Sequence, residues 1–253
     1  MKTIISLTSI PSRFNTLPAI VYDLEKRQDV DEIWVNIPYK YNRFPDVDVV
    51  VPNFHTSSKV IINRCVDYGP GTMYMGPATS ETCDADLVIV VNDDTRYPDN
   101  LSSKLIELYT NDPSCWCLSG FRVDEYINTN GRVNRYNREQ IDVTESYGGV
   151  ILDMKWLRDM KDIFLDFYKI TYNDDIIISN LLSKMGIKKK SICDMSLNIG
   201  MIKQYSYGMG EDALFQNNGE GSHVENNKRV FKLLHEKNLS YFNYDGQPRR
   251  DQR

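Results

Sequence analysis

The sequence predicts an α/β protein built on a mostly parallel β-sheet that is flanked by helices. Apolar, β-branched runs alternate with segments of helical periodicity through the first hundred residues. The run Leu87–Val91 shows no polar alternation, so both faces of this strand should be covered, as in the centre of a parallel sheet. With 253 residues, of which 41% are hydrophobic and 26% charged, the chain can bury one large core. We expect one domain over residues 1–240 and a flexible tail over 241–253.

Turn residues divide the first half of the chain into short elements. The expected strands, each bounded by proline, glycine or polar residues, are 3–9, 32–37, 47–51, 60–66, 87–91 and 115–119. A helix with Pro18 in its first turn follows the first strand, and another helix is expected over 100–110. This order of strands and helices is typical of a parallel sheet.

The middle of the chain departs from this alternation. Two strand-like segments, 123–127 and 133–136, flank Asn128–Gly131, which predicts a hairpin. We therefore expect an antiparallel element at one edge of the parallel sheet.

Capping residues mark the helices of the second half. Asp153 is the expected N-cap of one helix, and a second helix over 173–185 should end at Gly186. Ser222 and Glu225 have the spacing of a capping box at the start of a last helix.

Charge and cysteine content exclude several classes of protein. The net charge of −5 and the pI near 5.3 argue against a nucleic-acid-binding surface. The five cysteines are an odd number without C-x-x-C spacing, which indicates neither a disulfide framework nor a zinc site. No stretch approaches the roughly 18 apolar residues of a transmembrane helix, and the N-terminus begins with a strand. We expect a soluble, cytoplasmic protein.

Oxygen-bearing side chains follow the buried strand. Asn92, Asp93 and Asp94 come at its carboxyl end, where ligands bind in open α/β sheets. Two adjacent carboxylates repel each other unless a cation or hydrogen-bond donors neutralise them, which favours a hard divalent ion bound through oxygen. A solvated turn with an Asx cap is the alternative interpretation.

Three separate stretches together resemble the GT-A nucleotide-sugar glycosyltransferases. They are Ile4–Arg13, Asn92–Asp94 with Tyr97–Pro98, and Asn173–Asp175. Their order and spacing are most similar to small family-2-type enzymes of bacteria and of large algal viruses (chloroviruses). The resemblance implies a GT-A, Rossmann-like sheet and transfer of a sugar from a UDP- or GDP-linked donor to a glycan or glycoprotein acceptor. A viral member would act in the host cytoplasm.

The resemblance also implies roles at the donor site. Asp94 matches the position that binds the metal bridging the donor phosphates, Mn²⁺ or Mg²⁺, whereas Asn92 replaces the first Asp of the family motif. Asn92 and Asp93 would hydrogen-bond the ribose or the sugar. The base and ribose would be held by the first turn, through Thr8, Ser9, Ile10, Pro11 and Arg13. An ordinary β-to-α turn is the alternative.

Further polar contacts are expected around the donor. His223 follows the cap Ser222, where family members place a late histidine that completes the metal site; an exposed surface histidine is the alternative. Relatives often have a lysine after Thr72, where this chain has Met73. The missing phosphate contact would then come from Lys59, Arg64 or Arg96.

The resemblance places the acceptor side later in the chain. Asp174 and Asp175 match an acidic pair whose second member is the usual base of inverting enzymes, and N-capping by Asp174 is the alternative. Tyr147 would be an aromatic platform for the acceptor, beside Gly148 and Gly149, although a Gly-Gly bend also has a conformational explanation. The glycine-rich stretch 198–221 is expected to close over the substrates as a lid.

Two other functions are compatible with this sheet. A nucleotidyltransferase usually has a glycine-rich phosphate loop after its first strand, and Thr8–Arg13 contains no glycine. A non-catalytic nucleotide-sugar or carbohydrate-binding protein is suggested by Asn92 and Met73. Such a protein has little use for a base such as Asp175.

Overall fold

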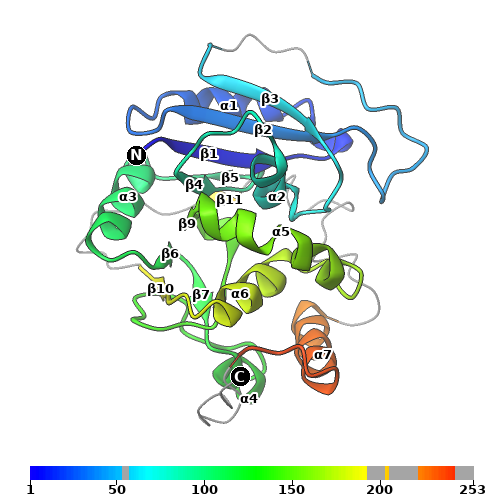
Figure 1. Cartoon of the computed structure of the whole chain (residues 1–253), viewed down its shortest axis with the longest axis vertical. Coiled ribbons are helices and arrows are strands. Elements are labelled where there is room, and N and C mark those ends of the chain that lie inside the picture. The colour runs from blue at the N-terminus through cyan, green and yellow to red at the C-terminus, as the bar shows by residue number, and fades with distance from the viewer. Residues whose placement is uncertain (53–56, 193–202, 205–221, 243–253) are drawn as a thin grey trace.

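The computed structural model describes residues 1–52, 57–192, 203–204 and 222–242 (Figure 1). Cys193, nearly all of the stretch expected to form a lid, and the end of the expected tail lie outside these residues. Among the helices of the described residues, none has the length and apolar character that a membrane crossing needs.

A seven-stranded sheet forms the centre of the fold. Its strands, in spatial order, are β10 (Lys189–Ser191), β6 (Cys115–Cys117), β9 (Val150–Asp153), β4 (Leu87–Val90), β1 (Thr3–Thr8), β2 (Glu32–Pro38) and β3 (Val60–Cys65). Neighbouring strands are parallel except where β9 pairs with β4 and β6. Every residue of the central strand β4 is buried, as its unbroken apolar run predicts. The predicted α/β class and mostly parallel sheet are confirmed.

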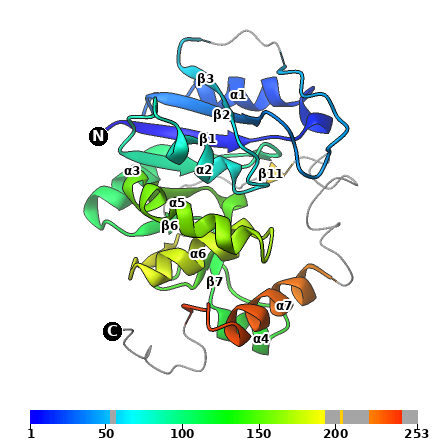
Figure 2. The same ribbon diagram turned by 45° about the vertical axis from the view of Figure 1, so that its right-hand side comes forward.

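Helices cover both faces of this sheet (Figures 1 and 2). The covering helices are α1 (Leu17–Glu25), α2 (Thr72–Thr79), α3 (Leu101–Asn111), α5 (Met154–Tyr168) and α6 (Asp174–Lys184). Helices α4 (Val123–Asn128) and α7 (His223–Glu236) lie together beyond one end of the sheet. Successive side chains of β2 point to opposite faces: Ile33 and Val35 pack with α1 and α3, whereas Trp34 belongs to the core with α2, α5 and α6. Each face therefore has its own apolar core.

The antiparallel elements are made by other residues than predicted. β7 (Gly120–Phe121) pairs with β8 (Val143–Thr144), and β5 (Thr95–Arg96) pairs with β11 (Lys203–Gln204). The hairpin predicted over 123–136 is wrong, because its first half is α4.

Long-range contacts explain this helix. Val123 and Tyr126, three positions apart, are both buried, and the Val123 N–H donates to Asp142 Oδ2 at 3.0 Å. A carboxylate 19 positions away thus satisfies an N-terminal donor of α4.

Two further local predictions fail. The segment 47–51 is not a strand: the Val47 and Val50 N–H groups bond to carbonyls two or three residues earlier, and Val50 is 75% exposed. Helix α2 is not predicted from the sequence, because Gly76 and Pro77 interrupt the helical pattern of residues 72–79. Gly76 is required there, since a Cβ at this position would lie 2.4 Å from Asn36 Oδ1.

Helix ends agree well with the sequence. Asp153 caps α5 by accepting from the Lys155 N–H at 2.8 Å, and Ser222 and Glu225 form both bonds of a capping box. Gly186 ends α6 with a φ of +76°. These three predictions are confirmed. Caps can be read from the sequence because they depend on bonds between residues that are close in the chain.

Candidate active site

Strand register brings three polar segments to the carboxyl edge of the sheet. Val90 of β4 pairs with Ser6 of β1 on one side and with Val150 of β9 on the other. Because β1 and β4 are parallel, Ser9 and Asn92–Asp94 leave the sheet at the same edge, and antiparallel β9 begins there. Strands lie about 4.8 Å apart, so the turn before β9 is within roughly 10 Å of the turn after β1.

Asp93 ties the first turn to the end of β4. Its carboxylate accepts from Ser9 Oγ at 2.5 Å and from Arg13 Nη1 at 2.7 Å, and the residue is only 5% exposed. Arg13 reaches it because Pro11–Arg13 forms a 3-10 turn. Burial raises the pKa of Asp93, while the Arg13 charge and the Ser9 hydroxyl oppose this shift.

Asp94 is held more loosely than its neighbour. Its oxygens accept from Thr95 Oγ1 at 3.1 Å and from Arg13 Nη1 at 3.2 Å, both near the long end of such bonds. Within the described part of the chain, no three His, Cys, Asp or Glu side chains gather as a metal cluster. Mg²⁺ is commonly bound through one or two carboxylates together with substrate phosphates. The role of Asp94 as a ligand of a divalent ion stays a prediction.

The other residues predicted to bind the nucleotide-sugar donor lie in or next to the same two turns as Asp93, Asp94 and Arg13. Thr8 Oγ1 donates to the Asn36 carbonyl at 2.8 Å, and the Ser9 carbonyl accepts from Tyr41 Oη at 2.7 Å. Half-buried Asn92 donates its N–H to Tyr97 Oη at 2.8 Å. Ile10 and Pro11 are half-buried at the start of the 3-10 turn.

The acidic pair lies at the start of α6. Asn173 caps this helix by accepting from the Ile176 N–H at 3.0 Å, so the alternative of N-capping by Asp174 is wrong. Asp175 Oδ1 instead accepts from the Ser146 N–H at 2.9 Å, in the turn before β9. Asp174 Oδ2 is buried and has no hydrogen-bond partner among the described residues.

Burial governs the ionisation of this pair. Loss of hydration raises the pKa of Asp174 to about 7. Loss of hydration also raises the pKa of Asp175 well above its ordinary value, and the neighbouring Asp174 charge adds to the shift. Two such close groups titrate as a unit, so the pair retains a proton near neutral pH.

The buried carboxylate of Glu145 also supports the turn before β9. Glu145 is 8% exposed; it accepts from Ser119 Oγ at 2.5 Å and from Arg135 Nε at 3.1 Å. Ser119 Oγ also lies 2.7 Å from Tyr147 Oη. This network is not predicted from the sequence, although Glu145 directly before the predicted acceptor segment is a signal for it.

The predicted acceptor residues lie in the same turn. Tyr147 is half-buried, whereas Gly148 and Gly149 are buried. A Cβ on Gly148 would lie 2.9 Å from the Ser119 backbone nitrogen, and Gly149 has a φ of +76°. Gly148 is therefore needed because the Ser119 backbone lies close to it, and Gly149 because its φ is positive.

The three basic residues proposed for phosphate contact are far apart. Lys59 precedes β3 and donates to the Arg27 carbonyl, at the opposite edge of the sheet, so its assignment to the donor is wrong. Arg64 lies 5.1 Å above the Tyr39 ring, and Arg96 approaches Asp23 at 4.0 Å. Arg13 is the basic residue bonded to both acidic residues of the edge.

The observed contacts of His223 lead through Asn227 to Asn173, the N-cap of α6. His223 is exposed at the first position of α7, and its Nε2 lies 3.2 Å from Asn227 Nδ2. Asn227 Oδ1 accepts from Nδ2 of the cap Asn173 at 2.8 Å. Its role as a metal ligand stays a prediction.

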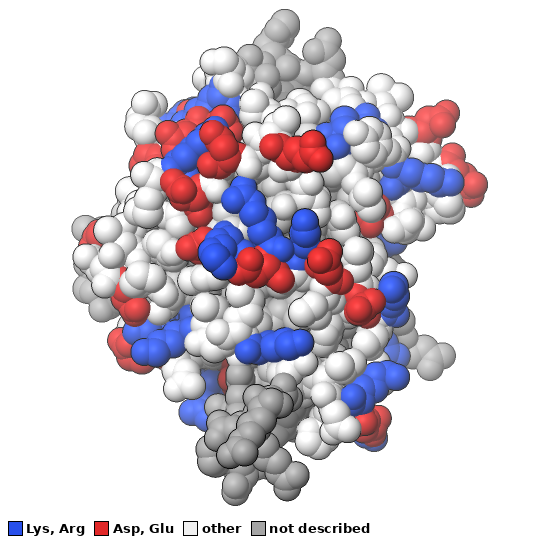
Figure 3. All heavy atoms as spheres, in the orientation of Figure 1, with Lys and Arg blue, Asp and Glu red and all other residues white. Residues whose placement is uncertain are grey.

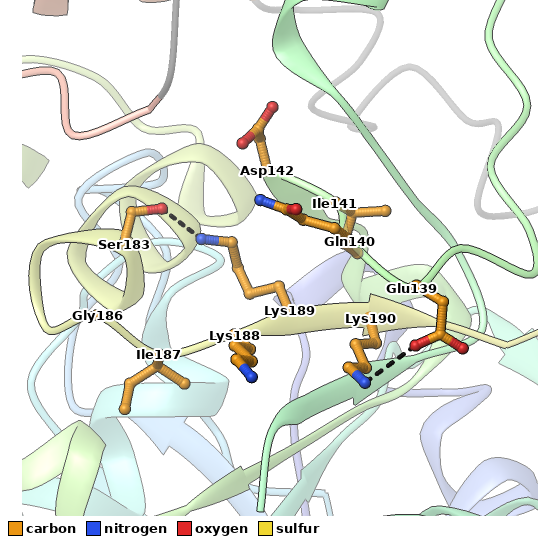
Figure 4. A pocket seen from close by; sticks show the side chains of 10 residues that line it. All are labelled: Glu139, Gln140, Ile141, Asp142, Ser183, Gly186, Ile187, Lys188, Lys189 and Lys190. Atoms are coloured by element: carbon orange, nitrogen blue, oxygen red, sulfur yellow. Dashed lines mark hydrogen bonds and ion pairs between the residues drawn. The ribbon is translucent and has the colours of Figure 1, made fainter. Parts of the chain in front are cut away.

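A cavity of about 380 Å³ lies elsewhere, between the end of α6 and β10 (Figure 4). Lys189 points across it toward Ser183, and Lys190 pairs with Glu139 at 3.0 Å. Ser183 is nine residues along α6 from Asp174, or roughly 13 Å. This cavity is therefore separate from the acidic edge.

Comparison with known proteins finds distant structural matches and no match of sequence. No family model and no curated protein matches the sequence. A 4-diphosphocytidyl-2C-methyl-D-erythritol synthase from Anaerococcus prevotii is 13% identical with a TM-score of 0.49, covering 76% of this chain and 86% of its own. TarS 1–349 of S. aureus is 11% identical with a TM-score of 0.49, covering 92% and 71%. A candidate glucose-1-phosphate thymidylyltransferase from Bacillus anthracis is 12% identical with a TM-score of 0.45, covering 89% and 99%. The likeness is too distant to indicate a reaction.

Proposed function

We propose that the protein is a GT-A-type glycosyltransferase that moves a sugar from a UDP- or GDP-linked donor to a glycan hydroxyl. One observation carries the proposal: two separate acidic clusters meet at one edge of the sheet, and they differ in their electrostatics. Asp93 and Asp94 are bonded to the guanidinium of Arg13. Among the described residues no Lys or Arg forms an ion pair with Asp174 or Asp175, and burial raises the pKa of each.

The first cluster suits the leaving diphosphate. Arg13 is 15% exposed and presents a fixed positive charge beside Asp94. A divalent ion held by Asp94, Mn²⁺ or Mg²⁺, would neutralise negative charge that develops on the departing diphosphate. Ser9 and Asp93 keep Arg13 and the first turn in place.

The second cluster suits the acceptor. The Ser146 N–H fixes one oxygen of half-buried Asp175, and the raised pKa makes this carboxylate a stronger base. Asp175 would take the proton of the attacking hydroxyl. The sugar would lie between the two clusters, since Asp93 and Asp94 follow β4 and Asp175 bonds to the turn before the adjacent strand β9. Attack from the face opposite the diphosphate inverts the anomeric carbon.

A reaction screen tests the proposal against its rivals. Nucleotide-sugars with Mn²⁺ and a mixture of glycan acceptors should release UDP or GDP. A nucleotidyltransferase would instead release pyrophosphate from a nucleoside triphosphate and a sugar 1-phosphate. A non-catalytic binding protein would bind a nucleotide-sugar or a glycan and release neither product. Either of the last two results would overturn the proposal.

A further inference from the structure

We propose that Tyr172 is the platform on which a sugar ring of the acceptor glycan stacks. The inference rests on the proposed function, because it names the acceptor side of that site. It adds a residue outside the motifs that carry the family resemblance.

Tyr172 is an exposed aromatic side chain on a rigid support. It is 57% exposed, and its ring stands at 86° to Tyr168 with a centroid distance of 5.0 Å. Tyr168 stacks on the fully buried Phe164 at 6.1 Å and 16°. Phe164 in turn contacts Tyr68 edge-on at 6.2 Å. This row of rings connects the surface to the core and holds the Tyr172 side chain in place. Binding of a ligand on Tyr172 therefore costs little side-chain entropy.

The position of Tyr172 points to the acceptor. It lies in the connection between α5 and α6, directly before the cap Asn173. Three residues span at most about 11 Å, so its backbone lies within that distance of the Asp175 backbone. The turn before β9 reaches the same base through the Ser146 N–H, and the neighbouring Tyr147 directs its Oη to Ser119 Oγ at 2.7 Å. In this proposal the sugar ring lies on Tyr172 and one of its hydroxyls lies at Asp175.

The chemistry of the surface favours a sugar over a protein partner. The face of a sugar ring carries C–H groups that pack on an aromatic ring, while its hydroxyls bond to polar neighbours. Asp174 and Asp175 accept hydrogen bonds when ionised. Leu165 of α5, 40% exposed, is the exposed large apolar residue nearest in the described sequence. The area of two exposed side chains is far smaller than the roughly 800 Å² that each partner buries in a stable protein interface.

The test measures transfer to methyl glycosides of glucose, galactose, xylose, rhamnose and fucose. Y172A should raise KM for the best of these acceptors by about 3- to 10-fold, the range for one lost aromatic contact. KM for the donor should change by a smaller factor. Y172F and Y172W should stay within about twofold of wild type. The matched control is Y22A, which removes a tyrosine of α1 that is 64% exposed and should leave both KM values unchanged.

Saturation-transfer NMR with the same methyl glycosides gives a readout that does not need turnover. Wild type and Y172F should show strong transfer to ring protons, and Y172A should lose it. Equal NMR signals in Y172A and wild type, or a larger effect of Y172A on donor KM than on acceptor KM, would overturn the inference. Failure of the proposed function is seen separately, as wild type that releases no nucleoside diphosphate from any nucleotide-sugar.

Discussion

Replacing Asp174 with Asn should stabilise the fold at alkaline pH. The pKa of Asp174 rises from an ordinary value of 3.8 to about 7 because the carboxyl is buried. Between these pH values the folded protein holds a proton that the unfolded chain releases, so stability is lost as pH rises toward 7. The shift corresponds to at most about 4 kcal/mol, and the Asn side chain never ionises. D174N should therefore be more stable than wild type at pH 8 by up to this amount, and similar at pH 4.

Urea unfolding of both proteins, followed by circular dichroism from pH 4 to pH 8, measures this difference. Asp46→Asn is the matched control, because it makes the same substitution at an exposed position. Part of the effect belongs to Asp175, which titrates together with its neighbour. A difference between D174N and wild type that is the same at pH 4 and pH 8 would refute the reasoning from burial.

Three further predictions concern the proposed reaction. Asp175→Asn should lower transfer by about 10²- to 10⁴-fold with donor affinity nearly intact; near-normal transfer would move the base elsewhere, with Asp174 the first alternative. Asp94→Asn should weaken Mn²⁺-dependent binding of UDP or GDP in calorimetry, and equal wild-type affinity with Mn²⁺ and with EDTA would remove the metal from the mechanism. The anomeric configuration should invert between donor and product, as read from the anomeric proton by NMR; a retained configuration would contradict Asp175 as a base for direct displacement.

Local physics explains which elements could be predicted. The uninterrupted run of β4 requires burial on both faces, and its acidic end follows directly in the chain. The caps Asp153, Ser222 and Gly186 act on backbone groups a few residues away. In each case the partners are close in sequence, so the pattern of residues contains the information.

Elements that depend on a distant partner could not be predicted in this way. The valine-rich segment 47–51 has strand propensity but pairs with no strand of the sheet among the described residues. Conversely, α2 is a helix although it contains Gly76 and Pro77. Gly76 lets this helix pack closely against Asn36 of β2. Tertiary contacts outweigh propensity at such positions.

The sequence by itself determined the buried central strand β4, the acidic residues that follow it and the capped start of the helix that contains Asp174 and Asp175. Only the tertiary structure decided how these groups are charged and held. Arg13 bonds to Asp93 across 80 positions, and Ser146 orients Asp175 across 29. The raised pKa of Asp174 comes from the burial of its carboxyl, and burial exists only once the chain has folded around it.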